Sequence, residues 1–198
     1  PGRDLTVFFE SDISTRRYVD DGFGRAIEWD LPLLDGYRHV FLPAFCGRAR
    51  ITALRPVTHG LARELVRGRF DVLWVHGYAR PAHLIAMANA KRIGLKVLLR
   101  DEPWRRSRPP GGAAKRLAKD IWFAALRGLV DGVLAIGSRN RDYMIGYGFD
   151  PSKTFLMPYA VDNAFFCDRA RAAASGREAL RAELRLEPDR PVILFAGK

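Results

Sequence analysis

The 198-residue sequence lacks the features that mark a membrane span, a disulfide framework or a metal site. No apolar run comes near the roughly 20 residues that a transmembrane helix needs. The start of the chain does not have the pattern of a secretory signal, and Pro1 in place of Met indicates a processed or trimmed chain. Cysteine is scarce: Cys46 and Cys167 are far apart and have no metal-ligand spacing, which favours reduced thiols in the cytoplasm.

Acidic residues are outnumbered, with 22 Asp and Glu against 33 Lys and Arg, a net charge of +11. Such a balance favours an anionic partner: nucleic acid, a membrane surface or a phosphorylated substrate. Zinc-finger spacing and RNP-type aromatic patterns are absent and the basic residues are scattered, so we expect no nucleic-acid partner. The alternative is solvated charge on a protein whose acidic partner domain is missing.

Short apolar runs alternate with helical patterns over the first 160 residues, which predicts an α/β fold with a parallel sheet. Strands are expected at 5–9, 39–42, 70–75, 96–99, 133–136 and 154–157. Helices are expected at 57–66, 81–93, 113–129 and 139–145. The run 70–75 is almost entirely apolar, as in a central strand that is buried on both faces.

The helical patterns also predict which faces pack against the sheet. In 57–66 the expected buried face comprises Val57, Leu61, Leu65 and Val66. In 113–129 Leu117, Ile121, Ala124 and Ala125 share one face, which Trp122 and Leu126 widen. Ser138 is predicted to cap the helix that follows the strand 133–136.

The stretch 131–166 carries an ordered set of residues: Ser138, Gly148, Phe149, Lys153, Phe155, Met157, Pro158, Val161, Asp162 and Phe166. Their order resembles the end of the N-terminal domain of GT-B glycosyltransferases, in particular glycosyltransferase family 4 of the polysaccharide-biosynthesis type. The resemblance implies a Rossmann-like, doubly wound acceptor domain over residues 1–160. Residues 161–191 would be an interdomain linker with a short helix, and 192–198 the first strand of a truncated C-terminal donor domain.

Polar residues follow two of the predicted strands, where ligands bind in an open parallel sheet. His76 follows the run 70–75, and Arg100, Asp101 and Glu102 follow the run 96–99. We expect His76, Asp101 and Glu102 to be catalytic, orienting an acceptor hydroxyl, and Arg100 to hold a phosphate or pair with the carboxylates. The alternatives are a structural histidine and an internal ion-pair network.

Further binding residues are expected in three places. Gly22 and Gly24 would present backbone amides to the acceptor, or else form an ordinary tight turn. Ser138 would contact substrate, and the resemblance places Gly197 and Lys198 at the donor diphosphate. Trp29 and Tyr37 are expected as core aromatics rather than as a stacking platform for the acceptor.

The resemblance implies transfer of a sugar, with retention at the anomeric carbon, from a nucleotide sugar to a saccharide or lipid-linked acceptor. No metal and no cofactor beyond the donor substrate are implied, and residues 1–198 alone would be inactive. A GT-B nucleotide-sugar epimerase or phosphorylase, or a non-catalytic Rossmann ligand-binding module, are the alternatives.

Basic residues gather around the helix 113–129. Arg105, Arg106 and Arg108 precede it, and Lys115, Arg116 and Lys119 occupy its start, with Trp122 in the next turn. This pattern predicts peripheral contact with an anionic membrane surface at its cytoplasmic, inner face. The alternative is a helix that packs on the sheet and has a solvated basic end.

Overall fold

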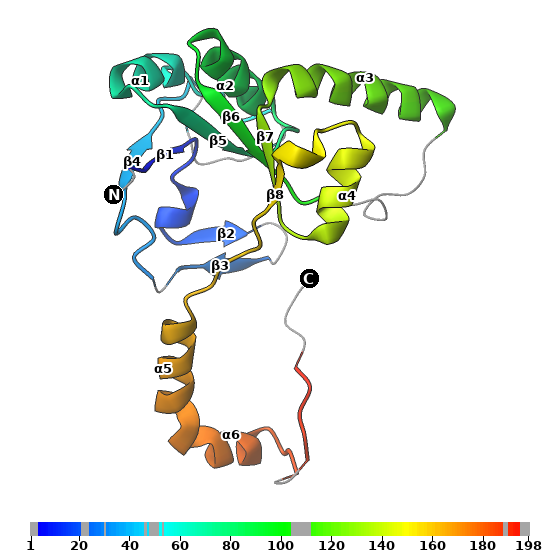
Figure 1. Cartoon of the computed structure of the whole chain (residues 1–198). Helices are drawn as coiled ribbons and strands as arrows, with labels where there is room; N and C mark the ends of the chain where they lie inside the picture. Colours follow the sequence, from blue (N-terminus) through cyan, green and yellow to red (C-terminus); the bar gives the residue numbers. More distant parts are fainter. Residues whose placement is uncertain are drawn as a thin grey trace. The chain divides into compact units, whose positions relative to one another are not determined.

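The computed structural model describes residues 4–20, 24–29, 31–45, 47, 52, 54–103, 112–187 and 190–194. The chain divides into two compact units, Pro1–Pro158 and Tyr159–Lys198, and each is described separately (Figure 1). Residues 104–110, which include Arg105, Arg106 and Arg108, lie outside the described residues, as do Gly22, Gly197 and Lys198.

A four-stranded parallel sheet forms the centre of the first unit, in the order β5-β6-β7-β8. Its strands are β5 (Val72–His76), β6 (Lys96–Arg100), β7 (Gly132–Ala135) and β8 (Thr154–Leu156). They are joined by α2 (Pro81–Arg92), α3 (Ala113–Leu129) and α4 (Ser138–Gly146), with the short 3-10 turn η2 (Pro151–Lys153) before β8. The predicted α/β fold with a parallel sheet is therefore confirmed.

The core lies on one face of this sheet. Each connection moves one strand in the same direction, and right-handed crossovers then place the connecting helices on the same side. α1 (Leu61–Gly68) and these helices bury side chains together with alternate strand residues. The fully buried members include Leu65, Met87, Val97, Leu99, Phe123, Leu126, Val133 and Met144. Helices packed on the second face, as a doubly wound sheet would have, are not found among the described residues.

The opposite face of β5 is open, which corrects the prediction of a strand that is buried on both faces. Leu73 and Val75 point into the core, whereas Val72 and Trp74 are 46% and 42% exposed. The reason is tertiary: successive side chains of a strand point to opposite faces of the sheet, and within the described residues helices cover only one of them. An apolar run alone does not distinguish these two environments.

The predicted inward faces of two helices, α3 and α1, are confirmed only in part. α3 has the predicted bounds, and Leu126 of its predicted face is buried, but Leu117 and Ile121 are each 62% exposed and Phe123, outside that face, is buried. The Phe123 ring stacks on Tyr147 with centroids 4.2 Å apart, so an aromatic cluster determines which side faces inward.

α1 begins later than predicted, at Leu61. Gly60 precedes it in the left-handed conformation, with φ 85°, so the helix does not extend back to Val57. Of the predicted face, Leu65 is buried and Leu61 is half-buried against the core, but Val57 and Val66 are exposed.

Two smaller sheets complete the first unit. β1 (Thr6–Phe9) pairs in parallel with β4 (Arg38–Phe41), and β2 (Tyr18–Asp20) pairs antiparallel with β3 (Arg25–Ile27). The 3-10 turn η1 (Ile13–Thr15) lies between β1 and β2.

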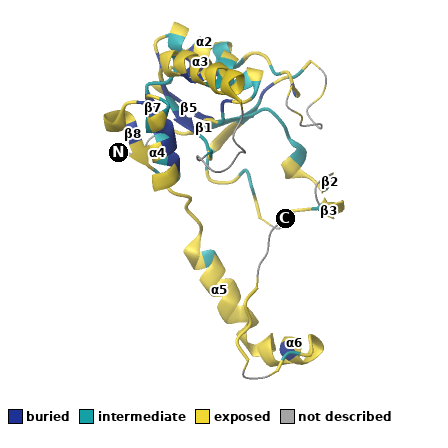
Figure 2. Ribbon diagram, turned by 90° about the vertical axis from the view of Figure 1, so that its right-hand side faces the viewer, coloured by how far each residue is buried: buried dark blue, intermediate teal, exposed yellow. Residues whose placement is uncertain are grey.

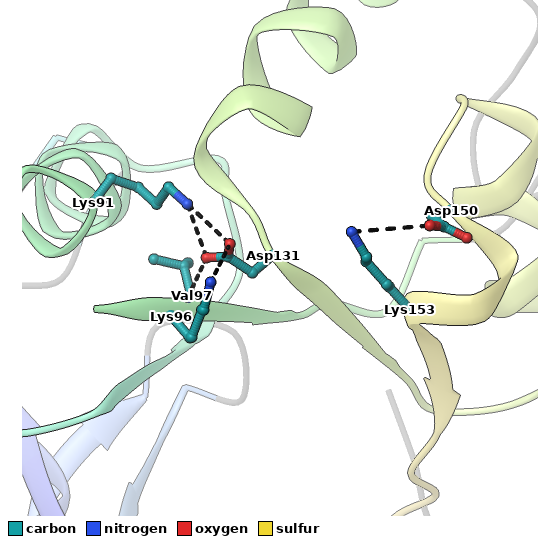
Figure 3. Close-up of polar contacts among 6 residues, drawn as sticks. All are labelled: Lys91, Lys96, Val97, Asp131, Asp150 and Lys153. Atoms are coloured by element: carbon teal, nitrogen blue, oxygen red, sulfur yellow. Dashed lines mark hydrogen bonds and ion pairs between the residues drawn. The ribbon is translucent and has the colours of Figure 1, made fainter. Parts of the chain in front are cut away.

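Asp131 joins three chain segments at the amino-terminal edge of the main sheet (Figure 3). Its carboxylate accepts the Val97 backbone N–H at 2.8 Å and both bonds from Lys91 Nζ, at 2.9 and 3.0 Å. Lys96 Nζ lies 3.8 Å away. Burial opposes ionisation of Asp131, but the Val97 N–H and the two lysines outweigh it and hold its pKa below the usual range. Asp131 therefore links α2, β6 and the start of β7.

The second unit contains α5 (Asn163–Ala173), the 3-10 turn η3 (Ala174–Gly176) and α6 (Arg177–Glu183). Asp162 caps α5 by accepting the Phe165 N–H at 2.9 Å. The strand predicted from residue 192 is not formed over 192–194, where Ile193 is 98% exposed. A strand needs a hydrogen-bonded neighbour, and these residues have none within the described part of the chain.

Candidate functional site

The carboxyl ends of β5 and β6 bring His76 and Arg100 side by side. The two residues are register partners, and the Gly77 N–H donates to the Arg100 carbonyl at 2.7 Å. On the open face of β5 the His76 ring stacks on Trp74 at 5.0 Å, and the Arg100 guanidinium lies 6.0 Å from the Trp74 ring centroid. Arg100 is buried, so its position is set by the sheet rather than by solvent.

Asp101 and Glu102 directly follow Arg100 and complete a charged group at this edge. The Asp101 carboxylate accepts the Glu102 N–H at 2.9 Å, which fixes the turn out of β6. Both carboxylates act electrostatically on His76. The structure thus brings together the four residues predicted here, while their catalytic and binding roles stay predictions.

Three further residues at this edge were missed by sequence reasoning: His83, Arg80 and Glu10. His83 lies in the first turn of α2, next to Gly77, where an added Cβ would approach the His83 ring to 3.3 Å. Arg80 forms an ion pair with Glu10 at 2.5 Å and donates to the Arg55 carbonyl at 2.8 Å. The sequence signal that could have indicated Arg80 and His83 was Pro81. Proline favours the first position of a helix, so its neighbours are expected at the amino end of α2.

Both histidines have a lowered pKa. Burial is the main cause for His76, followed by the positive charge of Arg100, and Asp101 and Glu102 oppose the shift. For His83 burial is again the main cause of the lowered pKa. The negative charge of Glu10 opposes the shift, and the positive charge of Arg80 adds to it. The two imidazoles are therefore neutral at pH 7 and each has a ring nitrogen that can accept a proton.

A cavity of about 570 Å³ opens beside these residues, between β1 and β5. Its walls are apolar along Phe8, Phe70 and Trp74. Its polar lining includes Glu10, Ser11, Ser14, His76, Arg80 and His83. His83 Nδ1 is buried and has no hydrogen-bond partner among the described residues. A cavity with apolar walls and a few convergent polar groups is typical of a small-molecule site.

A second hollow of about 250 Å³ adjoins this cavity through Ser14, which lines both. It contains Trp29, together with Arg16, Glu28 and Asp35. Trp29 is 52% exposed, so the prediction that it is a core aromatic is wrong. Tyr37 is half-buried and donates its hydroxyl to the Leu33 carbonyl. An exposed indole surrounded by carboxylates and a guanidinium has the chemistry of a surface that stacks on a sugar ring.

The remaining predicted residues lie elsewhere. Gly24 belongs to the β2–β3 hairpin, where its N–H donates to the Asp20 carbonyl at 2.8 Å and its φ is 61°. The hairpin by itself explains this conformation, as the tight-turn alternative predicted, and it does not directly follow β1.

Ser138 is the first residue of α4 at the carboxyl end of β7, and it is exposed. It makes no capping bond, because Gly137 occupies the cap position. Asn140, which sequence reasoning missed, is buried and accepts the Ile136 N–H at 3.2 Å while donating to the Pro103 carbonyl at 2.7 Å. It therefore links the exits of β6 and β7.

The described part of the chain contains no cluster of three or more His, Cys, Asp or Glu residues arranged to hold a metal ion. Within the same residues, no helix combines the length and apolar character that crossing a membrane requires. No protein-family model matches the sequence, and a search of curated proteins found no match.

Proposed function

We propose that this chain contains the acceptor-binding domain of a retaining glycosyltransferase of the GT-B, family 4 type, of the kind that builds polysaccharides. The observation that supports this most directly is the polar group at the carboxyl edge of a parallel sheet. His76, His83, Arg100, Asp101 and Glu102 gather there, and the two histidines line the 570 Å³ cavity.

The chemistry of this edge suits a hydroxyl nucleophile. In the proposed reaction the acceptor oxygen forms a bond to the anomeric carbon, and the bond from that carbon to the donor diphosphate breaks. A neutral imidazole, His76 or His83, takes the hydroxyl proton, because its lowered pKa leaves a ring nitrogen free to accept it. Asp101 and Glu102 hold the acceptor by hydrogen bonds to its hydroxyls.

The two hollows suit the two parts of a lipid-linked saccharide. A sugar ring stacks on the exposed face of Trp29, with Glu28 and Arg16 within the same hollow for its hydroxyls. The apolar stretch of the larger cavity, along Phe8 and Trp74, accepts the start of an apolar chain. Arg80, at its polar end, is placed for a phosphate that joins the two parts.

The donor is a nucleotide sugar, held by the second domain of the proposed enzyme. Gly197 and Lys198 would meet its diphosphate, and no metal or further cofactor takes part. Residues 1–198 alone would therefore bind acceptor without transferring sugar. We place the reaction in the cytoplasm, at the inner face of a membrane, where lipid-linked acceptors are located.

Saturation-transfer NMR on residues 1–198 tests the assignment of this domain to the acceptor. A panel of mono- and oligosaccharides is expected to show contacts that Trp29→Ala and His76→Ala abolish. Trp122→Ala is the matched control, because Trp122 is a similarly accessible indole on α3, at 39% exposure against 52% for Trp29. Nucleotide sugars are expected to show no contacts. Saccharide signals that survive both site variants, or nucleotide sugars that bind in place of saccharides, would contradict the assignment.

A further inference from the structure

The outward face of α3 is apolar along its whole length. Its members share one side of the helix, are all exposed, and carry no polar side chain: Ala113, Ala114, Leu117, Ala118, Ile121, Ala124, Ala125 and Gly128. In Figure 2 most of the α3 ribbon has the colour of exposed residues. The opposite side, with Phe123 and Leu126, packs in the core, so the outward stripe is not part of the core. We call these eight residues the α3 stripe.

Basic residues border the α3 stripe. Lys115 and Arg116 flank it in the first turns, and neither side chain has a hydrogen bond or ion pair within the described part of the chain. The first turn contains no acidic residue, and Asp120 is the one carboxylate in the helix. Lys119 is separate from this border, because its Nζ lies 5.0 and 4.9 Å from the ring centroids of Tyr143 and Tyr147.

We infer that α3 lies flat on an anionic bilayer surface, with the α3 stripe facing the acyl chains and Lys115 and Arg116 at the headgroups. An amphipathic helix with a basic border binds at such an interface through buried apolar area and attraction to anionic lipid. The sequence analysis counted Lys119 among the basic residues expected at the membrane. In the structure Lys119 lies over the rings of Tyr143 and Tyr147 and is not part of the basic border.

A second copy of the chain fits the α3 stripe less well. In an antiparallel pair of α3 helices, Lys115 and Arg116 would approach Arg127 of the other copy. In a parallel pair they would approach their own equivalents. Either arrangement places like charges together on a chain of net charge +11, whereas phosphate headgroups complement them.

This inference deepens the membrane location proposed above, and its test does not depend on sugar transfer. The assay is co-sedimentation of residues 1–198 with vesicles of phosphatidylcholine alone or of equal parts phosphatidylcholine and phosphatidylglycerol. Wild type is expected to pellet with the anionic vesicles, and sodium chloride is expected to weaken the binding. The double variant Leu117→Gln and Ile121→Gln is expected to lose binding.

Two further variants separate charge from apolar contact. Lys115→Gln with Arg116→Gln is expected to weaken anionic-vesicle binding about 30-fold, from about 1 kcal/mol for each basic residue. Val66→Gln with Ile85→Gln is the matched control, since these residues are 59% and 60% exposed on other helices, and it is expected to bind as wild type does. Circular dichroism is expected to be unchanged in every variant, because all the altered side chains are exposed.

Equal binding to neutral and anionic vesicles, or no loss in the α3 stripe variant, would overturn the inference. It would also be overturned by light scattering that shows a vesicle-independent dimer which the Leu117 and Ile121 changes abolish. That result would assign the α3 stripe to a second copy of the chain.

Discussion

Replacing Asp131 tests whether the amino-terminal edge of the sheet is held by a single carboxylate. Asp131→Ala removes the acceptor of the Val97 N–H and of two bonds from Lys91 Nζ. Val97 is fully buried, so its orphaned N–H costs about 1–3 kcal/mol. Lys91 is 34% exposed and can turn to water, so its lost pairing adds only about 1 kcal/mol. We expect Asp131→Ala to lower the free energy of unfolding by about 3 kcal/mol.

Asp131→Asn is expected to cost less, about 1–2 kcal/mol, because an amide oxygen still accepts the Val97 N–H but carries no charge for the lysines. For a chain of this length each kcal/mol lowers Tm by about 2–4 °C. Urea and thermal unfolding followed by circular dichroism measure both variants. Asp142→Asn is the control, since Asp142 is exposed on α4 and has no ion pair or hydrogen bond among the described residues.

The pH dependence provides a second check on Asp131. Its folded-state pKa lies below the unfolded value of about 3.9, so its stabilisation is present above that value. As pH falls through the folded pKa the stabilisation is lost, and the difference between wild type and Asp131→Asn is expected to shrink. An Ala variant within about 0.5 kcal/mol of wild type, or a difference that does not change with acid, would refute the reasoning.

The remaining predictions concern the carboxyl edge. In an enzyme that includes the donor domain, His76→Ala and Asp101→Asn are expected to lower kcat/KM by roughly ten- to a thousandfold, because each removes a positioned polar or acid–base group. Their Tm is expected to stay near wild type, and normal kinetics or unfolding in both variants would exclude the site. The lowered pKa of both histidines means that the unfolded chain binds more protons just below about pH 6.5, so stability is expected to fall with acid there. In a His76→Gln, His83→Gln variant, urea unfolding should show a smaller loss of unfolding free energy as the pH is lowered. A loss equal to that of wild type would contradict this.

The sequence predicted the parts of this site that depend on strand ends. His76 and Arg100 were found because a parallel sheet places the carboxyl ends of its strands at one edge, and the strand bounds were nearly correct. The contribution of Glu10 could not be found in this way. Its ion pair with Arg80 joins residues 70 positions apart, and no local pattern reports such a contact.

Burial was predicted less well than secondary structure. α3 was predicted from Ala113 to Leu129, and the structure has those bounds, but of its predicted face only Leu126 is buried. Both sides of the helix carry apolar residues, and the aromatic partners of Phe123 come from other elements. In β5 the alternation of buried and exposed residues follows from one covered and one open face of the sheet, which a uniformly apolar run does not encode.

The most direct test of the proposed function is product analysis with the protein that joins residues 1–198 to a donor domain. Labelled nucleotide sugars are incubated with lipid-linked and free saccharide acceptors, and the anomeric configuration of the product is determined by NMR. The proposed function predicts a glycosylated acceptor with the configuration of the donor, and no product from residues 1–198 alone. No transfer from any nucleotide sugar would contradict it, as would release of an epimerised nucleotide sugar or a free sugar phosphate, or turnover by residues 1–198 alone.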